Sequence, residues 1–330
     1  LAMSHPYREY WHYPNPGKPR EWRFCLLDLS HRMKAHELAG VVEMGAYQHI
    51  KVNSSLGPVG AEVSGVDLSQ PLSCDVIAEI HAAWLDHHVL FFHDQDMSPE
   101  AQVQFSANFG ELDQYKFMQA ADETPYVIPI IKEPDAEMNF GGGWHTDSSY
   151  QAIPPKATVL YAVEVPEEGG DTLFANATAA FESLSEGMKE NLQRWQCVFS
   201  PKLVHGSSGF YKGKEAEKNL GASYGGDESY AETEVLHPLI RTHAETGAKS
   251  IYCGMAHTVN IDGWSRDDSL PIFRYLTDHM TQDQFVTRFK WRQGSLAMWD
   301  NRCVFHYALN DYHGHRRHMH RVTIKGEKPA

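Results

Sequence analysis

The sequence has few cysteines and no pattern that would tie them together. Five cysteines are scattered over 330 residues, and no C-x-x-C occurs, so neither a disulfide framework nor a zinc-thiolate site is expected. Long apolar runs are also missing: the densest one, residues 89–92, is far shorter than the roughly 18 residues that span a bilayer. The first residues lack the apolar core of a signal peptide. We therefore expect a cytoplasmic protein with no membrane partner.

Basic residues are scarce relative to acidic ones. The chain has 29 lysines and arginines against 43 aspartates and glutamates, which gives a net charge of −14. Proteins that bind nucleic acid usually carry a basic face, so no nucleic-acid partner is expected. A hydrophobic content of 42% is sufficient for a folded core and excludes global disorder.

The first 47 residues differ in composition from the rest. Six aromatic residues between positions 7 and 24 stand among four prolines, at positions 6, 14, 16 and 19, and proline blocks regular helix. We expect residues 1–47 to form an arm that packs on the body or on a neighbouring subunit, which favours a homo-oligomer. A lid over the substrate is the alternative.

Residues 48–330 show the pattern of short strands. Strands are expected at 62–68, 89–92, 126–131, 157–165, 285–291, 295–299 and 321–324, and a hairpin with its turn at 244–247. Helices are expected after Ser73 and Ser98 and from Thr178. Residues 206–232 predict a loop, either a lid or a surface insertion. With no βαβ rhythm, the pattern favours a mainly β sandwich or barrel with flanking helices, an α+β chain.

One histidine has a carboxylate at ligand spacing. The only H-x-D is His145-Thr146-Asp147, and residues i and i+2 of a strand project from the same face. With a third ligand from another strand they would form a facial triad, which suits non-haem Fe(II). The only H-x-E, His243-Ala244-Glu245, falls in the predicted hairpin turn. We interpret that pair as structural, with Glu245 facing solvent.

Cationic groups gather near the C-terminus. Arg316, Arg317, His320 and Arg321 follow His306 within 16 residues. They form an anion pocket if they face inward, and a basic surface strip if they do not. Arginine binds carboxylates in a bidentate manner, so a metal with an inward arginine fits a dicarboxylate cosubstrate.

Several motifs occur in a fixed order from about residue 48 to the end. They are GAEVSGVDL (60–68), FGEL (109–112), WHTD (144–147), PPKAT (154–158), GGDTL (169–173), HPLIRTH (237–243) and WDN (299–301), with HYA (306–308) and Arg317 after them. Together they resemble the Fe(II)/2-oxoglutarate-dependent taurine dioxygenase (TauD/TfdA) family. The resemblance implies a double-stranded β-helix, the cupin-like jelly roll.

The resemblance also implies roles for single residues. His145, Asp147 and His306 match the iron ligands, and Thr172 and Arg317 match the residues that bind the distal carboxylate of 2-oxoglutarate. Arg321 matches a position that holds the anionic head of the substrate in sulfonate- and sulfate-oxidising members. On a strand, residues 317 and 321 share a face about 13 Å apart and can serve separate anions.

Two positions depart from the taurine-oxidising pattern. Asp113-Gln114-Tyr115 stands where those enzymes carry a histidine, and Gly141 stands where they carry an asparagine. Taurine is therefore not the expected substrate. Asp113 and Tyr115 could face the cationic head of a zwitterion, and for Asp113 the alternative is a solvated loop position.

The implied activity is that of an enzyme using Fe(2+), 2-oxoglutarate and O2. It would hydroxylate a small, anionic organic molecule, such as a sulfonate, a sulfate ester or an aryloxy acid, with release of succinate and CO2. Hydroxylation beside a heteroatom would lead to C–S, C–O or C–N cleavage. The alternatives are a non-oxidative cupin-like isomerase or small-molecule sensor, which a fourth histidine ligand would favour, and a purely structural module.

Overall fold

The computed structural model describes residues 47–54, 56–118, 124–211 and 228–330. The chain divides into two units, Leu1–Met44 and Gly45–Ala330, and the description below concerns the second. The arm predicted at 1–47 lies, except for residue 47, outside the described residues, as does the middle of the predicted loop at 206–232. No helix in the described ranges combines the length and the apolar character needed to cross a membrane.

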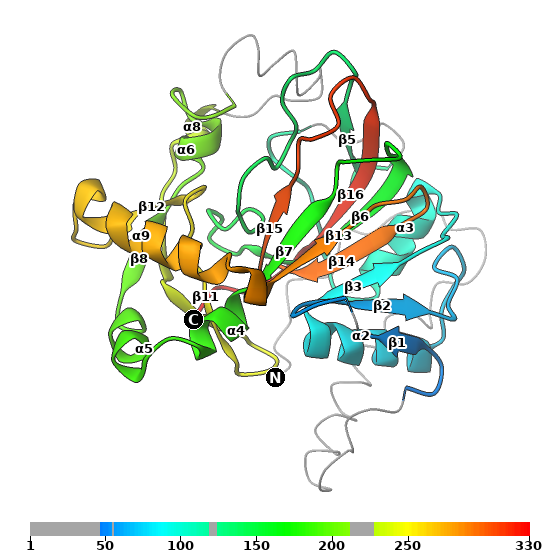
Figure 1. Cartoon of the computed structure of the whole chain (residues 1–330), viewed down its shortest axis with the longest axis horizontal. Helices are drawn as coiled ribbons and strands as arrows, with labels where there is room; N and C mark the ends of the chain where they lie inside the picture. The colour runs from blue at the N-terminus through cyan, green and yellow to red at the C-terminus, as the bar shows by residue number, and fades with distance from the viewer. Residues whose placement is uncertain (1–46, 55, 119–123, 212–227) are drawn as a thin grey trace, which may run out of the picture. The chain divides into compact units, whose positions relative to one another are not determined.

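A large sheet forms the centre of the second unit (Figure 1). Its strands run in the order β1-β2-β3-β14-β6-β16-β4, and β5 also pairs with β16. All pairs are antiparallel except β2 with β3. The strands are β1 (Lys51–Asn53), β2 (Ala61–Ser64), β3 (Val89–Phe92), β4 (Leu112–Asp113), β5 (Ile128–Lys132), β6 (Pro155–Glu164), β14 (Leu296–Asp300) and β16 (Arg317–Lys325).

The two faces of this sheet belong to different cores because side chains alternate along a strand. In β14, Leu296 and Met298 join a core under the helices α2 (Cys74–His87) and α3 (Pro99–Ala107). Ala297 and Trp299 face the opposite way, into a second core. Both helices begin where serine caps were predicted, with Ser73 and Ser98 accepting the first free backbone N–H groups.

A smaller sheet lies against the second face. Its strands are β7 (Thr172–Asn176), β13 (Val286–Phe289) and β15 (Val304–Ala308), in the order β13-β7-β15. Phe174 and Val304 from this sheet share a core with Leu160 and Met319 from the large one. Two facing antiparallel sheets with helices outside them agree with the predicted double-stranded β-helix.

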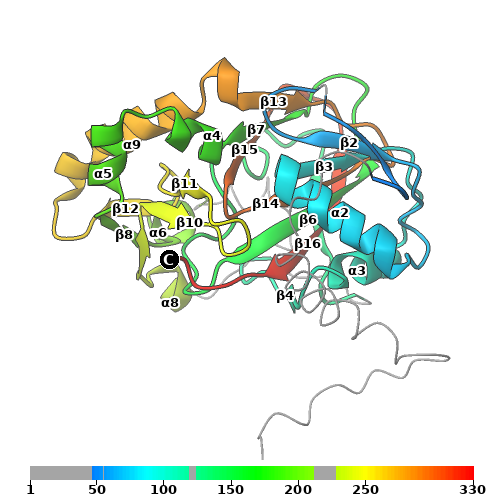
Figure 2. The same cartoon turned by 90° about the horizontal axis from the view of Figure 1, so that it is seen from below.

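The remaining elements form a third layer beside the sheets (Figure 2). A three-stranded sheet, a hairpin and several helices share a separate core. These elements are β8 (Gln196–Phe199), β9 (Val235–Pro238), β12 (Thr258–Ile261), the hairpin β10 (Ile240–Thr242) and β11 (Lys249–Ile251), and α4 (Ala177–Glu182), α5 (Glu186–Leu192), α6 (Lys202–His205), α8 (Glu228–Ala231), α9 (Arg266–Met280) and the 3₁₀ turn η1 (Asp283–Phe285). Helix α4 begins one residue before the predicted Thr178, because Asn176 is its cap.

Candidate metal centre

Two histidines from distant parts of the chain are held together by backbone pairing. His306 lies on β15, and His145 forms an isolated bridge with it, with hydrogen bonds of 3.1 and 2.8 Å between their backbones. Their imidazole centroids are 4.1 Å apart. The small sheet therefore fixes the distance between the two rings before any metal binds.

Asp147 completes the group. Its Oδ1 lies 3.8 Å from His145 Nε2 and 3.8 Å from His306 Nε2, and one ligand atom from each residue lies within 4.8 Å of the others. Residues 145 and 147 converge as their spacing predicted, but the strand expected there is only an isolated bridge at His145, and Asp147 lies in a turn. Two imidazole nitrogens and one carboxylate oxygen in this arrangement could hold one divalent ion.

A hydrogen-bond network fixes the other side of the Asp147 carboxylate. Thr158 Oγ1 donates to Asp147 Oδ2 at 2.6 Å, and Asn301 Nδ2 donates to Thr158 Oγ1 at 3.0 Å. Trp299 Nε1 donates to Asn301 Oδ1 at 2.9 Å, which sets the orientation of the amide. The Trp299-Asp300-Asn301 motif thus supports a ligand rather than acting as one, and Oδ1 of Asp147 remains available to an ion.

The protonation of the group also suits a metal. His145 Nδ1 donates to the carbonyl of Gly143 at 2.7 Å, so Nε2 carries the lone pair. Burial lowers the pKa of His145 and of His306 and keeps both rings neutral. Burial alone raises the pKa of Asp147, but opposing interactions, that with the Arg321 guanidinium first, outweigh it and hold that pKa well below its usual range.

Arg321 lies beside this group. Its Nη2 is 3.4 Å from Asp147 Oδ1, and its guanidinium covers the ring of Tyr115 at 4.8 Å. The side chain is buried, and its Nε and Nη2 make no hydrogen bond to described residues. Asp113 lies half-buried on β4, opposite Thr323, and is not among the residues that line the described pocket. The structure thus brings Tyr115, but not Asp113, to the site.

Arg317 lies at the opposite end of the same strand face. It is buried, and its Nε and Nη2 make no hydrogen bond within the described chain. Its guanidinium carbon is 5.8 Å from the ring of Trp291, whose Nε1 donates to Thr172 Oγ1 at 2.9 Å. Trp291 therefore connects Arg317 with Thr172, and the hydroxyl hydrogen of Thr172 remains free for an acceptor.

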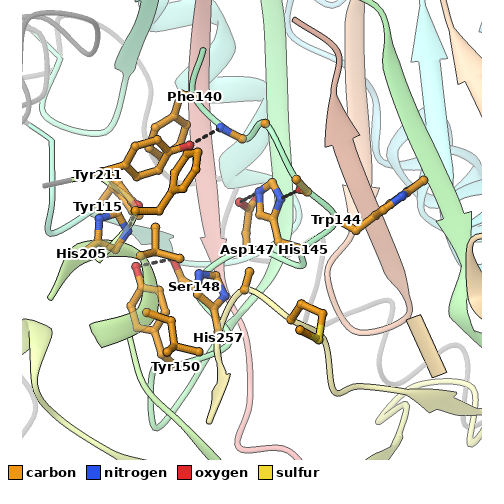
Figure 3. Close-up of a pocket in the computed structure, with 18 residues that line it drawn as sticks. Tyr115, Phe140, Trp144, His145, Asp147, Ser148, Tyr150, His205, Tyr211 and His257 are labelled. Carbon is orange, nitrogen blue, oxygen red and sulfur yellow. Dashed lines mark hydrogen bonds and ion pairs between the residues drawn. The ribbon is translucent and has the colours of Figure 1, made fainter. Parts of the chain in front are cut away.

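A cavity of about 340 Å³ opens beside the metal-ligand group. Figure 3 shows His145 and Asp147 on one side and the rings of Tyr115, Phe140 and Tyr211 facing them. His205, Tyr150 and His257 complete the wall (Figure 3). Burial lowers the pKa of His205 to about 3, and that of His257 also falls well below its usual range. Both rings are therefore neutral, and the cavity is predominantly aromatic.

The predicted loop at 206–232 borders this cavity. Phe210 and Tyr211 line it, together with residues 203–205 just before the loop, and the backbone N–H of Gly141 donates to the Tyr211 hydroxyl oxygen at 2.9 Å. Residues 212–227 lie outside the described part of the chain. Whether the loop acts as a lid thus stays a prediction.

The H-x-E pair belongs to a second buried cluster. His243 Nδ1 accepts the backbone N–H groups of Glu245 and Thr246, so Nε2 donates to Asp300 Oδ2 at 2.9 Å. Arg302 pairs with the same carboxylate at 2.7 Å and with Glu245 at 2.5 Å. Cys303 is also near, but His243 offers no lone pair toward it. The structural interpretation agrees with this geometry. Glu245 is exposed, as expected, and it also pairs with His81 at 2.9 Å.

The aromatic wall could not be found from the sequence. Phe140 stands near the H-x-D motif, but Tyr150, His205, Tyr211 and His257 carry no spacing that links them to it. They reach the cavity through loops and through the third layer. The hydrogen-bonding role of Thr158 was likewise hidden inside the PPKAT motif.

Comparisons with known proteins agree with this arrangement. The taurine catabolism dioxygenase TauD, TfdA family matches residues 52–323. An alkylsulfatase of Acinetobacter baylyi is 33% identical over 85% of this chain and 86% of its own. An α-ketoglutarate-dependent sulfate ester dioxygenase of Pseudomonas putida is 32% identical, over 85% and 91% respectively. An α-ketoglutarate-dependent 2,4-dichlorophenoxyacetate dioxygenase of Cupriavidus pinatubonensis is 30% identical, over 80% and 93%.

Solved structures share the fold. A putative α-ketoglutarate-dependent taurine dioxygenase from Burkholderia xenovorans superposes with a TM-score of 0.69 at 32% identity, covering 85% of this chain and 91% of that one. AAD-2, solved with Mn(II) and N-oxalylglycine, superposes with a TM-score of 0.66 at 30% identity, covering 86% and 99%. The predicted jelly-roll fold class is confirmed. So is the resemblance drawn from the motifs: the chain belongs to the taurine catabolism dioxygenase TauD, TfdA family.

Proposed function

We propose that this dioxygenase uses Fe(II), 2-oxoglutarate and O2, the cofactor set predicted from the sequence, to hydroxylate a small organic anion with an apolar body. One observation carries the proposal. A three-ligand group opens onto an aromatic cavity, and two buried arginines lie on one strand face beside it. Fe(II) supplies the oxidative decarboxylation of 2-oxoglutarate to succinate and CO2 and the transfer of one oxygen atom to the substrate.

His145, Asp147 and His306 are the proposed iron ligands. Their donor atoms fit a divalent ion, because both rings are neutral and the free carboxylate oxygen faces them. Thr158 holds the other oxygen of Asp147 and prevents the carboxylate from turning. With these three residues as ligands, the side of the ion toward the cavity would stay open.

Arg317 and Thr172 are proposed to bind the distal carboxylate of 2-oxoglutarate. A buried guanidinium without hydrogen-bond partners needs an anion to offset its desolvation. The hydroxyl of Thr172 has its oxygen satisfied by Trp291, so its hydrogen is available to a carboxylate oxygen. Together they would set the orientation of the cosubstrate.

Arg321 is proposed to hold the anionic group of the substrate. It contacts two residues that line the cavity, Asp147 and Tyr115, and the described wall there is largely aromatic. A substrate that combines one anionic group with an apolar body matches this wall. The relatives include enzymes named for sulfate esters and for an aryloxy acid. Hydroxylation of the carbon that bears the ester oxygen would give an unstable product that collapses with C–O cleavage.

A fourth histidine ligand would favour the non-oxidative alternative. His257 is the nearest candidate in the described cavity, with its ring centroid 6.4 Å from that of His145. Its Nδ1 is engaged by Ser149 Oγ at 3.0 Å, and it does not belong to the ligand group. The dioxygenase is therefore the better-supported function.

The test is substrate-stimulated succinate release. Iron-loaded protein would be incubated with 2-oxoglutarate and O2 and a panel of alkyl sulfates, alkyl sulfonates, aryloxy acids and taurine, with a control lacking substrate. We expect one apolar anion class to stimulate succinate release, with product in equal amount, and Asp147→Ala to abolish it. No succinate from protein shown to contain iron would contradict the proposal.

A further inference from the structure

Lys132 is a buried lysine whose charge has no partner in the described chain. It is the last residue of β5 and is 3% exposed. Its Nζ makes no hydrogen bond and lies 4.5 Å from the centroid of the Tyr312 ring. Lysine is rarely buried without a partner, because desolvation of an ammonium is costly. The proposed mechanism above does not use this residue.

The strand register places Lys132 directly opposite Arg317. The two residues are partners in the antiparallel pair of β5 and β16, and directly opposed residues have their side chains on the same face. Arg317 is also buried, with Nε and Nη2 free of hydrogen bonds. Like charges opposite each other destabilise a sheet, so two buried cations here indicate that an anion binds between them.

Gly170, Tyr312, Trp291 and Thr172 surround the two cations, and we call this group the cradle. A Cβ added at Gly170 would lie 3.3 Å from Arg317 Cδ and 3.3 Å from Tyr312 Cδ1, so Tyr312 and Arg317 meet over this glycine. Lys132 lies on the ring of Tyr312, and Arg317 lies near Trp291, which holds Thr172.

The neighbouring carboxylate of Asp171 does not neutralise this pair. Asp171 raises the pKa of Arg317 only against the larger, opposing effect of burial. Its Oδ2 is bound by Arg288 Nε at 2.6 Å, and its buried Oδ1 makes no hydrogen bond to either cation. The buried charges of Lys132 and Arg317 therefore still need an anion from outside the described chain to offset their desolvation.

The cradle is separate from the substrate end of the site. Ile130 and Met319 are the next pair along the same two strands and pack in the core between the sheets. Arg321 follows them, opposite Ile128. Lys132 therefore belongs with Arg317 rather than with the cavity at Arg321.

We propose that Lys132 is a further binding residue for the distal carboxylate of 2-oxoglutarate, donating to one carboxylate oxygen while Arg317 and Thr172 bind from the other side. This inference rests on the proposed function. It predicts that Lys132 contributes to affinity for a 2-oxo acid only when that acid has a second carboxylate. A lysine that merely packs on Tyr312 would not make this distinction.

The experiment measures binding rather than turnover. Full-length protein loaded with Mn(II) would be titrated by calorimetry with 2-oxoglutarate and with 2-oxobutyrate, which lacks the distal carboxylate. The variants are Lys132→Met and Lys132→Arg, with Lys116→Met as the matched control. Lys116 also lies on a tyrosine ring, 4.0 Å from that of Tyr230, but it is exposed. Loss of a charged hydrogen bond predicts roughly tenfold to a hundredfold weaker 2-oxoglutarate binding in Lys132→Met.

The other variants make the result specific. We expect Lys132→Arg to stay within a few fold of wild type, Lys116→Met to be unchanged, and 2-oxobutyrate to bind all four proteins alike. Unchanged 2-oxoglutarate binding in Lys132→Met, or an equal loss for both acids, would overturn the role of Lys132. If Lys132→Met does not fold, Lys132→Gln takes its place with the same expectation. Failure of the wild type to bind 2-oxoglutarate, with Mn(II) bound, would instead overturn the proposed function.

Discussion

The hydrogen bond from Thr158 to Asp147 offers a sharp test of how the metal centre is built. Thr158→Val keeps the shape of the side chain and removes the hydroxyl that donates to Asp147 Oδ2 at 2.6 Å. The buried carboxylate then loses a donor, and Asn301 Nδ2 loses its acceptor. A hydrogen bond to a charged group contributes about 1.5–3 kcal/mol. We therefore expect the free energy of unfolding of the metal-free protein to fall by about 2 kcal/mol.

The same change should weaken metal binding. Without Thr158 the carboxylate of Asp147 can rotate away from the two imidazoles, and loss of such a supporting contact typically costs 10- to 100-fold in metal affinity. Urea unfolding would measure the stability of the metal-free protein, and competition with a fluorescent chelator would measure Mn(II) affinity.

A matched control lies on the neighbouring strand. Thr323 is the register partner of Thr158, and its buried hydroxyl has no hydrogen-bond partner in the structure. Thr323→Val should leave stability and metal affinity unchanged, or increase stability, because it replaces an unsatisfied polar group. Equal effects of the two substitutions, or none from Thr158→Val, would refute the role assigned to the Thr158 hydroxyl.

Two further predictions concern charged groups. Arg321→Ala should raise the KM of the stimulating substrate at least tenfold and leave 2-oxoglutarate binding within a few fold, since that side chain lies at the cavity end of the strand; an equal loss of both would assign Arg321 to the cosubstrate. Asp300→Asn should lower the free energy of unfolding at pH 7 by about 3–5 kcal/mol, because Arg302 is left buried without its full partner, while metal uptake stays at one ion per chain. Arg302 and His243 outweigh burial and hold the pKa of Asp300 well below its usual range. The contribution of Asp300 to the free energy of unfolding is therefore complete above about pH 4 and is lost in acid. Urea unfolding at decreasing pH should show the stabilities of wild type and variant converging.

Local signals in the sequence determined much of the fold. Strand β3 has the predicted bounds, and helices α2 and α3 begin at the predicted serine caps, because alternation and capping depend on neighbouring residues alone. Helix α9 was not among the expected elements. Its Pro271 lies within the helix, and proline is ordinarily a helix-breaking signal. Strand β15 was not among the expected elements either, since its stability depends on pairing with β7; His306, which it carries, was identified only through the family motif.

In the candidate site, too, local signals could be read from the sequence and long-range pairing could not. His145 and Asp147 were found from their i, i+2 spacing, but the strand assumed for them is reduced to a single bridge at His145, with Asp147 in a turn. Nothing in the local sequence marks Lys132 as a binding residue, because its position opposite Arg317 depends on the pairing of β5 with β16. The aromatic wall of the cavity also depends on the tertiary structure, since Tyr115, Tyr150 and His257 come from separate loops.

The geometry of strand β16 would let the protein bind two different anions at separate positions. Side chains alternate along a strand, so Arg317, Met319 and Arg321 share one face, with the two cations about 13 Å apart by strand geometry. Met319, with Ile130 opposite, places apolar core between them. The spacing is therefore set by backbone register, not by loops. In the proposed reaction, changes in the loops around the cavity would alter the substrate while the cosubstrate end at Arg317 and Lys132 stays fixed, so loop substitutions should change substrate preference without changing 2-oxoglutarate affinity.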